Sequence, residues 1–165
     1  DMLSTIGKRL QIPYPLIMRI NGMKSTGIRV GQRLKVIKGP IHLTVVKHRY
    51  ELQAWLGDRC VGLYPVALGE KNSTPEGTFL VKSKLEDPPY QPQHKPVSAH
   101  RPGGATDNPL GTRWIDLGDS YGIHGTIEPD KIGQAVSEGC VRMLNENIEE
   151  LYTIIPVGTP VKLEK

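Results

Sequence analysis

The chain has 165 residues, of which 38% are hydrophobic and 5% aromatic, and its net charge is +4. This length suits one or two small globular domains, and the 18 glycines and 14 prolines favour turns and short strands over a helical bundle. No apolar run approaches the roughly 18–20 residues of a membrane-spanning helix, so we expect no membrane span. No secretory signal is visible.

The charge is distributed unevenly along the chain. Residues 1–40 contain eight lysines and arginines against Asp1 alone, whereas the rest holds 13 basic and 16 acidic residues. This difference predicts a basic front module and a mildly acidic back module. A basic module favours polyanions, either a cell-wall polymer or a nucleic acid, although an ordinary solvated surface explains most of the lysines equally well. Tyr14 alone offers stacking in the front, so a nucleic-acid partner is the weakest candidate.

Residues 1–38 are predicted to form two short helices followed by a strand. Leu3, Ile6 and Leu10 share one helical face, and Asp1 stands at the N-terminal cap or in the first turn of that helix. The other signals are Pro15 at the start of a second helix, Asn21-Gly22 at its end, and an alternating pattern over 28–36 that favours an edge strand.

The front resembles a LysM module, a βααβ unit that binds glycans containing N-acetylglucosamine. The strings D-M-L-S-T-I, L-I-M-R-I-N-G and I-R-V-G-Q-R-L-K-V carry the resemblance. The first strand of the module and the glycine before Asp1 have no counterpart. The resemblance implies a small α+β glycan-binding module over 1–38 with its first strand missing. The matching positions are Asp1, Leu3, Ile6, Ile20, Asn21, Gly31, Gln32 and Leu34.

After Gly39-Pro40, a predicted boundary, the hydrophobic pattern changes to a period of two. Residues 41–48, 49–56 and 59–68 are predicted to be strands of an antiparallel sheet, with Gly57-Asp58 as a hairpin turn. The pattern therefore favours a mainly β domain. Further elements are predicted at 78–82, 113–117, 121–124 and 161–163 (strands) and in a helix that Asn145 caps, with Ile148, Leu151, Tyr152 and Ile155 on its apolar face.

Residues 86–112 carry six prolines and three glycines and predict a long irregular loop. Such loops inside compact domains are often lids or cleft walls, and a disordered insertion is the alternative. His94 and His100 lie in this loop. Because no second ligand stands at a recognisable spacing, we predict polar loop residues or substrate contacts there and no metal site.

The stretch 121–143 holds His124 and Cys140, 16 positions apart. A cysteine attacks as the thiolate, and a nearby imidazole and a cation such as Arg142 both favour that form. Gly139 lets the backbone approach a bound carbonyl closely, so N–H groups at Glu138, Gly139 and Cys140 are candidates for an oxyanion pocket. From these residues alone, a buried structural cysteine with a satisfied histidine is an equal alternative.

The second cysteine, Cys60, stands in an alternating run and is interpreted as a strand residue. A disulfide between Cys60 and Cys140 is the alternative in an oxidising compartment.

The strings Y-G-I-H-G-T, S-E-G-C-V-R-M and T-P-E-G-T-F together resemble the catalytic domain of the L,D-transpeptidase (YkuD-type) family over roughly 41–163. The resemblance implies a β-sandwich catalytic domain, taken here as 41–165, that uses a cysteine nucleophile without metal or organic cofactor. It assigns Cys140 as the nucleophile, His124 as its base and the Gly125 carbonyl as the group that orients His124. Further roles at the oxyanion pocket and the substrate site fall to Gly139, Glu138, Ser137 and Arg142.

Some family members carry a second histidine where this chain has Glu138, whose carboxylate is expected to oppose thiolate formation. The implied reaction moves a peptidoglycan tetrapeptide stem, with loss of its terminal D-alanine, onto the side-chain amine of another stem, giving a 3→3 cross-link. An L,D-carboxypeptidase and a non-catalytic wall-binding protein are the alternatives. The implied partners are stem peptides and glycan strands, and the implied location is extracytoplasmic, at the cell wall, the spore or the periplasm.

Overall fold

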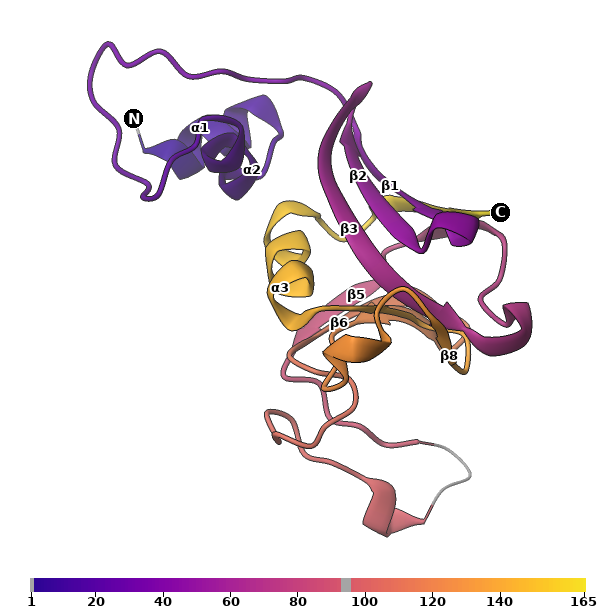
Figure 1. Cartoon of the computed structure of the whole chain (residues 1–165). Coiled ribbons are helices and arrows are strands. Elements are labelled where there is room, and N and C mark those ends of the chain that lie inside the picture. Colours follow the sequence, from indigo (N-terminus) through magenta and orange to yellow (C-terminus); the bar gives the residue numbers. More distant parts are fainter. Residues whose placement is uncertain (1, 93–95) are drawn as a thin grey trace.

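The computed structural model describes residues 2–92 and 96–165, and that part of the chain is mostly β with three short α-helices (Figure 1). Helices α1 (Leu3–Leu10) and α2 (Tyr14–Ile20) form the front, and α3 (Asn145–Ile154) precedes the last strand. The strands are β1 (Ile41–Val46), β2 (Glu51–Leu56), β3 (Arg59–Gly69), β4 (Gly77–Leu80), β5 (Ser83–Glu86), β6 (Arg113–Gly118), β7 (Tyr121–His124), β8 (Ala135–Ser137), β9 (Val141–Met143) and β10 (Pro160–Glu164).

All of these strands belong to one sheet, in the order β4-β10-β1-β2-β3-β9-β7-β6-β5, with β8 attached to β3. The 11-residue β3 joins two halves of the sheet, because its first part pairs with β2 and its last part with β9 and β8. Figure 1 shows β3 curving from one half to the other, and α3 packs against β6 and β7. The mainly β class is confirmed, and the expected sandwich takes the form of one continuous curled sheet.

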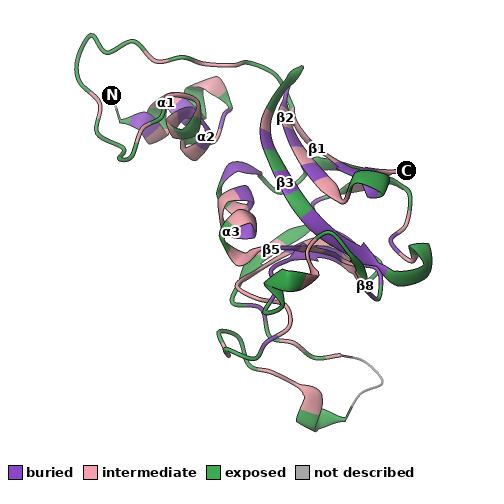
Figure 2. Ribbon diagram, viewed as in Figure 1, coloured by how far each residue is buried: buried purple, intermediate pink, exposed green. Residues whose placement is uncertain are grey.

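Period-two patterning accounts for the core. In β2, Leu52, Ala54 and Leu56 are buried, whereas the residues between them are partly exposed. Helix α3 adds Ile148 and Leu151 to the same core. Figure 2 shows buried segments on α3 and on the strands around it, and further ones on α1 and α2.

The front departs from its prediction in the second half. Residues 28–36 form no strand, although α1 and α2 lie where the pattern predicted helices. A strand needs a neighbour for its N–H and C=O groups, and no strand in residues 2–92 or 96–165 pairs with 28–36. The Asn21 side chain serves instead: its Oδ1 accepts from Lys35 N at 2.7 Å and its Nδ2 donates to Lys35 O at 2.8 Å.

Both predicted helix caps differ in detail. Asp1 lies outside the described residues, and α1 starts after Met2 without a side-chain cap. Helix α3 begins at Asn145, but Leu144 holds the cap position and the Asn145 side chain bonds to a different part of the chain.

Arg19 of α2 links the front to the sheet. Its Nη1 donates to the Tyr64 hydroxyl at 2.8 Å and also pairs with Glu150 of α3. Burial raises the pKa of Tyr64 to about 12, so the hydroxyl stays neutral and accepts this bond. The front is thus attached to both β3 and α3.

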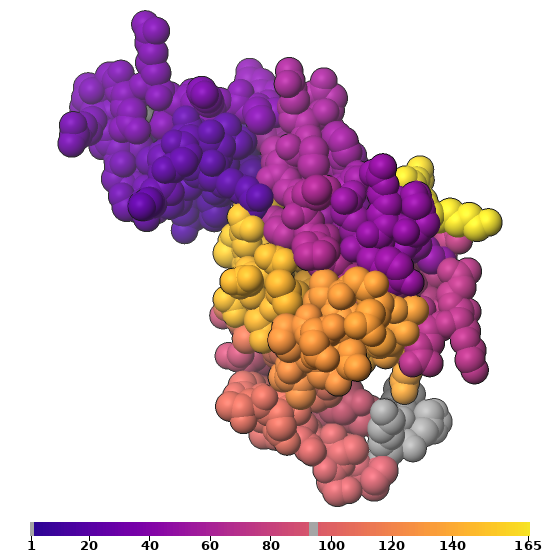
Figure 3. All heavy atoms as spheres, in the orientation of Figure 1, coloured from indigo at the N-terminus to yellow at the C-terminus, as the bar shows by residue number. Residues whose placement is uncertain are grey.

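The loop predicted over 86–112 is irregular where the structure describes it. It extends away from the sheet (Figure 1) and forms the lower end of the molecule in the space-filling view (Figure 3). Its base is closed, because Asp87 N donates to Thr112 O at 2.9 Å. Tyr90 and Arg101 exchange two backbone hydrogen bonds of 2.9 Å. The interpretation of His94 falls outside the described residues, whereas His100 follows a short 3-10 turn, Val97–Ala99.

Candidate active site

The pairing of β7 with β9 places His124 on the strand next to the one that follows Cys140. The two strands run parallel, with Ile123 opposite Val141 and His124 opposite Arg142. Cys140 directly precedes β9, and its Sγ lies near the backbone of Ser120 and Gly122, at the start of the strand that ends with His124. One strand pair therefore bridges the 16 positions between them in the chain.

His124 is buried and held in one orientation. The residue is 4% exposed, and its Nδ1 lies 2.6 Å from the carbonyl oxygen of Gly125. A carbonyl only accepts hydrogen bonds, so Nδ1 carries the proton and Nε2 keeps its lone pair. The Trp114 indole stacks on the imidazole with ring centres 5.6 Å apart and restricts the ring further.

Burial lowers the pKa of His124 to about 4, and the positive charge of Arg142 acts in the same direction. Hydrogen bonds to the carbonyls of Gly125 and Leu110 raise the same pKa, because they stabilise the protonated ring. The imidazole is consequently neutral near pH 7 and able to accept a proton, with two carbonyls already positioned to stabilise the charge that results.

The thiol of Cys140 contacts backbone groups. Its Sγ lies 3.8 Å from the carbonyl oxygen of Ser120, and the Gly122 backbone hydrogen-bonds to it as well. Burial raises the pKa of Cys140; the Gly122 contact and the charge of Arg142 lower it, and the charge of Glu138 raises it. Arg142 and Glu138 act on the thiol in the predicted directions, but burial outweighs Arg142, so the pKa of Cys140 is raised and the resting form is the thiol. The thiol needs a base before it can attack.

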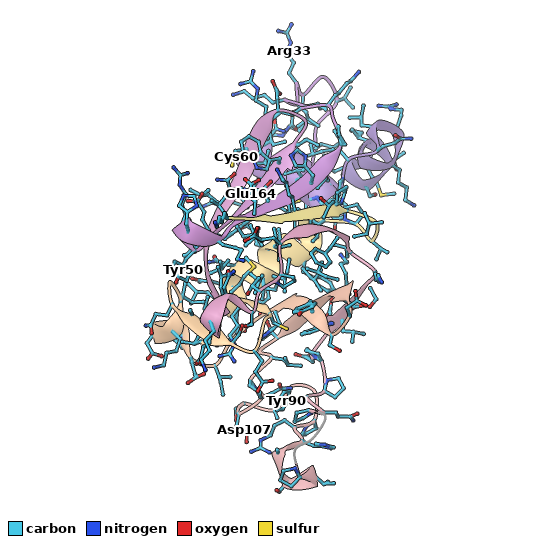
Figure 4. The ribbon with its side chains drawn as sticks, turned by 90° about the vertical axis from the view of Figure 1, so that its right-hand side faces the viewer. Arg33, Tyr50, Cys60, Tyr90, Asp107 and Glu164 are labelled. Carbon is cyan, nitrogen blue, oxygen red and sulfur yellow. The ribbon has the colours of Figure 1, made fainter. Side chains whose placement is uncertain are left out.

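Both cysteines are free thiols, so the alternative disulfide is not formed. Cys60 is exposed on β3 (Figure 4), and its Sγ lies 3.3 Å from the carbonyl oxygen of Gly62.

The turn between β8 and β9 is shaped by Ser137. This buried side chain donates to the Cys140 carbonyl at 2.6 Å and accepts from Gly139 N at 3.2 Å. Gly139 has φ +141°, and an added Cβ would lie 2.7 Å from the Tyr121 ring. Because its N–H already bonds to Ser137, Gly139 supplies backbone shape here, and the N–H of Cys140 is the better candidate for an oxyanion donor.

Arg142 projects from β9 on the face of His124. Its Nη1 lies 3.4 Å from Glu128 Oε2, and its buried Nε has no hydrogen-bond partner among the described residues. A buried N–H without an acceptor raises the free energy of the folded protein, and a ligand that supplies an acceptor would remove this cost. Glu138, the neighbour of the turn, is exposed.

A hollow of about 480 Å³ lies beside the segment that follows His124, and neither His124 nor Cys140 lines it. Thr126 and Asn145 line it, and Thr106 adds a wall from the 86–112 loop. The described part of that loop therefore contributes to a wall of this hollow. The described residues contain no group of three or more histidine, cysteine, aspartate and glutamate side chains that would hold a metal ion.

A family model described as the L,D-transpeptidase catalytic domain (YkuD) matches residues 40–163. The chain belongs to this L,D-transpeptidase family. A LysM domain model matches residues 1–36 of the same L,D-transpeptidase. The two matches together indicate a cell-wall-associated protein. None of the helices in the described part is long and apolar enough to cross a membrane.

Relatives of this L,D-transpeptidase come from several bacteria. YqjB of Bacillus subtilis, named as an L,D-transpeptidase, is 40% identical over 132 residues, which are 76% of this chain and 72% of YqjB. YkuD of Bacillus subtilis, also named as an L,D-transpeptidase, is 32% identical over 174 residues, which cover 100% of this chain and 94% of YkuD.

Solved structures share the fold of this L,D-transpeptidase at low sequence identity. L,D-transpeptidase 3 from Mycobacterium tuberculosis has a TM-score of 0.65 at 15% identity, over 76% of this chain and 61% of that one. A C442S mutant of the Enterococcus faecium L,D-transpeptidase has a TM-score of 0.61 at 17% identity, over 77% and 50%. The chain thus spans between half and two thirds of these longer proteins.

Sequence reasoning did not find three contributors to the site of this L,D-transpeptidase: the Trp114 ring, the Leu110 carbonyl and the Asn145 side chain. One signal was available for Trp114. Gly122 lies inside a strand, and such a glycine often marks a close approach; a Cβ there would lie 2.5 Å from the Trp114 ring. A backbone carbonyl such as that of Leu110 leaves no signal in residue types.

Proposed function

We propose that this L,D-transpeptidase acts on peptidoglycan stem peptides with Cys140 as nucleophile and His124 as base. The observation that carries the proposal is the fixed, neutral imidazole, whose Nδ1 bonds to Gly125 at 2.6 Å and whose Nε2 is the ring nitrogen left without a proton, on the strand next to the one that follows Cys140. A buried thiol with a raised pKa needs such a base. Neither group requires a metal or an organic cofactor for this step.

The reaction has two half-steps. In the first, Cys140 passes its proton to His124 and its sulfur attacks the carbonyl of the third, diamino-acid residue of a tetrapeptide stem. The C–N bond to the terminal D-alanine breaks, and the proton on His124 goes to the leaving amine, which leaves a thioester on Cys140. In the second, the side-chain amine of another stem attacks the thioester and loses a proton to His124, which returns it to the sulfur. The product is a 3→3 link.

Two groups are suited to the charges that arise. The N–H of Cys140 is the proposed donor to the oxyanion, with Gly139 and Ser137 fixing the backbone around it. Arg142 is the proposed partner of a substrate carboxylate, since its buried Nε has no partner among the described residues and its Glu128 contact is long, at 3.4 Å. The charge of Glu138 raises the pKa of the Cys140 thiol and so opposes its ionisation.

The division of labour proposed for the chain is a glycan-binding module over 1–38 and a catalytic domain over 41–165. The LysM match and the basic composition of the front support the first part. In this proposal the protein is extracytoplasmic, because its substrate is the peptidoglycan of the cell wall.

Disaccharide-tetrapeptides incubated with the protein test the reaction, with D-alanine release and dimers followed by mass spectrometry. We expect C140A to lose both products and C60A, a matched change at the other free thiol, to keep them. Equal activity of C140A and the parent contradicts the nucleophile. Release of D-alanine with tripeptide monomers and no dimer, under saturating acceptor, identifies water as the acceptor and a carboxypeptidase in its place.

A further inference from the structure

Asn145 lies where two loops meet beside His124. Its Oδ1 is 3.2 Å from Thr126 N and 3.3 Å from Thr112 N. Both partners are N–H donors, so the side-chain atom that faces them must be the amide oxygen and not the amide nitrogen. One oxygen thus joins the segment that follows β7 to the segment that precedes β6.

These two segments carry the carbonyls that hold the imidazole. Gly125 O accepts from His124 Nδ1, and its peptide group is the one whose N–H, on Thr126, donates to Asn145. The Leu110 carbonyl also hydrogen-bonds to His124, two residues before Thr112. Asn145 therefore fixes the backbone behind both contacts.

The space around the amide oxygen is closed by two glycines. A Cβ on Gly125 would lie 2.1 Å from Asn145 Oδ1, and a Cβ on Gly111 would lie 2.2 Å from it. Gly111 also has φ +64°, which favours glycine. Only hydrogen atoms at these positions let the oxygen approach both N–H groups, so the glycines and the asparagine form one unit.

The Gly125–Thr126 peptide is hydrogen-bonded at both ends. An acceptor on its N–H polarises the peptide and makes its carbonyl a stronger acceptor, since hydrogen bonds in a chain reinforce one another. We propose that Asn145 is a positioning residue, which through this peptide keeps the proton of His124 on Nδ1 and leaves Nε2 free for the Cys140 proton. The proposal rests on the proposed role of His124 as the base.

Three variants test this. N145S keeps a polar residue at the helix start but is too short to reach both N–H groups, and N145D keeps an acceptor of the same shape. N147S makes the first change two residues later in α3 and is the matched control. We expect N145S to lower kcat about tenfold with KM unchanged within about twofold, and N145D and N147S to stay near the parent.

The deciding readout is the protonation of His124, measured by ¹⁵N NMR of the imidazole. We expect one tautomer, with the proton on Nδ1, in the parent, N145D and N147S, and a mixture in N145S. A single tautomer in folded N145S overturns the proposal. If the tautomer changes while kcat does not, the role of His124 as base fails and the positioning by Asn145 stands.

A measurement on the unaltered protein covers the case in which N145S does not fold. Coupling across the hydrogen bond between Thr126 N and the side-chain carbonyl carbon of Asn145 is expected in its NMR spectra. Absence of that coupling, with ordinary couplings visible in the sheet, overturns the proposal.

Discussion

The front of the chain and the curled sheet each depend on an asparagine in place of a missing backbone partner, with different consequences. In the front, Asn21 bonds to both backbone groups of Lys35 and replaces a strand neighbour. In the sheet, Asn145 receives two N–H groups from loops next to His124. We call each asparagine with its hydrogen bonds a clamp. The Asn21 clamp holds the front module together, whereas the Asn145 clamp also orients the His124 imidazole. The same side chain thus has a local structural effect in one region and a chemical effect in the other.

The surroundings of the two clamps also differ. From residue 2 to residue 50 the chain has no aspartate or glutamate, and basic residues such as Arg33 stand at one end of the molecule (Figure 4). Asp107 lies at the opposite end in the same view. Residues 2–38 therefore contain no carboxylate side chain of their own, and their described contacts include the backbone bonds of Asn21 and the pair of Arg19 with Glu150.

Gly125→Ala is expected to have the largest effect of the changes considered. The Cβ of the new alanine would lie 2.1 Å from Asn145 Oδ1, so Asn145 must move away from the N–H groups of Thr112 and Thr126. We expect a loss of about 3 kcal/mol in the free energy of unfolding, measured in urea, together with loss of activity. Gly27→Ala, whose Cβ meets nothing closer than 3.7 Å, is the control. Equal stability of the two variants would contradict the clamp.

Acid is expected to destabilise the sheet region through His124. In the folded protein the pKa of His124 is about 4, below its ordinary value of 6.5, so the unfolded chain binds the proton more readily. The stabilisation is complete above pH 6.5 and is lost as the pH falls towards 4, by about 3 kcal/mol. Denaturation curves of the parent and H124Q from pH 7 to pH 4 measure it. Parallel loss in both proteins would rule out this assignment.

Asn21→Ala tests the clamp of the front. It removes both bonds to Lys35, and we expect about 2 kcal/mol less protection of the Lys35 amide in hydrogen exchange. Turnover of soluble stem peptides should remain that of the parent, because no group of the site changes. A fall in kcat comparable to that of N145S would show that the two clamps are not separate.

Arg19→Ala is expected to have the smallest effect. The variant loses the 2.8 Å bond to Tyr64 and the partly exposed pair with Glu150, which together contribute about 1 kcal/mol. Removal of the positive charge also raises the pKa of Tyr64 further, a change that ultraviolet titration records. A loss well above that amount would mean that the front and the sheet are one cooperative unit.

Most strands and the family followed from the sequence, because the alternation of apolar residues and the composite motif can both be read from residue types. What failed depended on distant partners. The pattern at 28–36 resembles a strand, yet a strand requires a neighbour that local pattern does not reveal. Asparagine is a residue type that often caps helices, but the N–H groups that donate to Asn145 belong to residues 33 and 19 positions away in the chain.

The protonation state of Cys140 depends on a quantity of the same kind, its burial. Charged neighbours such as Arg142 can be read from the sequence, whereas the degree of burial cannot. Burial decides the direction of the pKa shift here. The proton acceptor therefore matters more to this site than the nearby charge.

The closed base of the 86–112 loop has a consequence for how such domains diversify. The Asp87–Thr112 bond and the 2.7 Å bond from Asn108 Nδ2 to Pro88 O seal the loop where it leaves the sheet. Residues beyond that seal can be replaced, lengthened or exchanged between homologues without moving His124. Changes in the outer loop are therefore expected to leave the surroundings of His124 as they are.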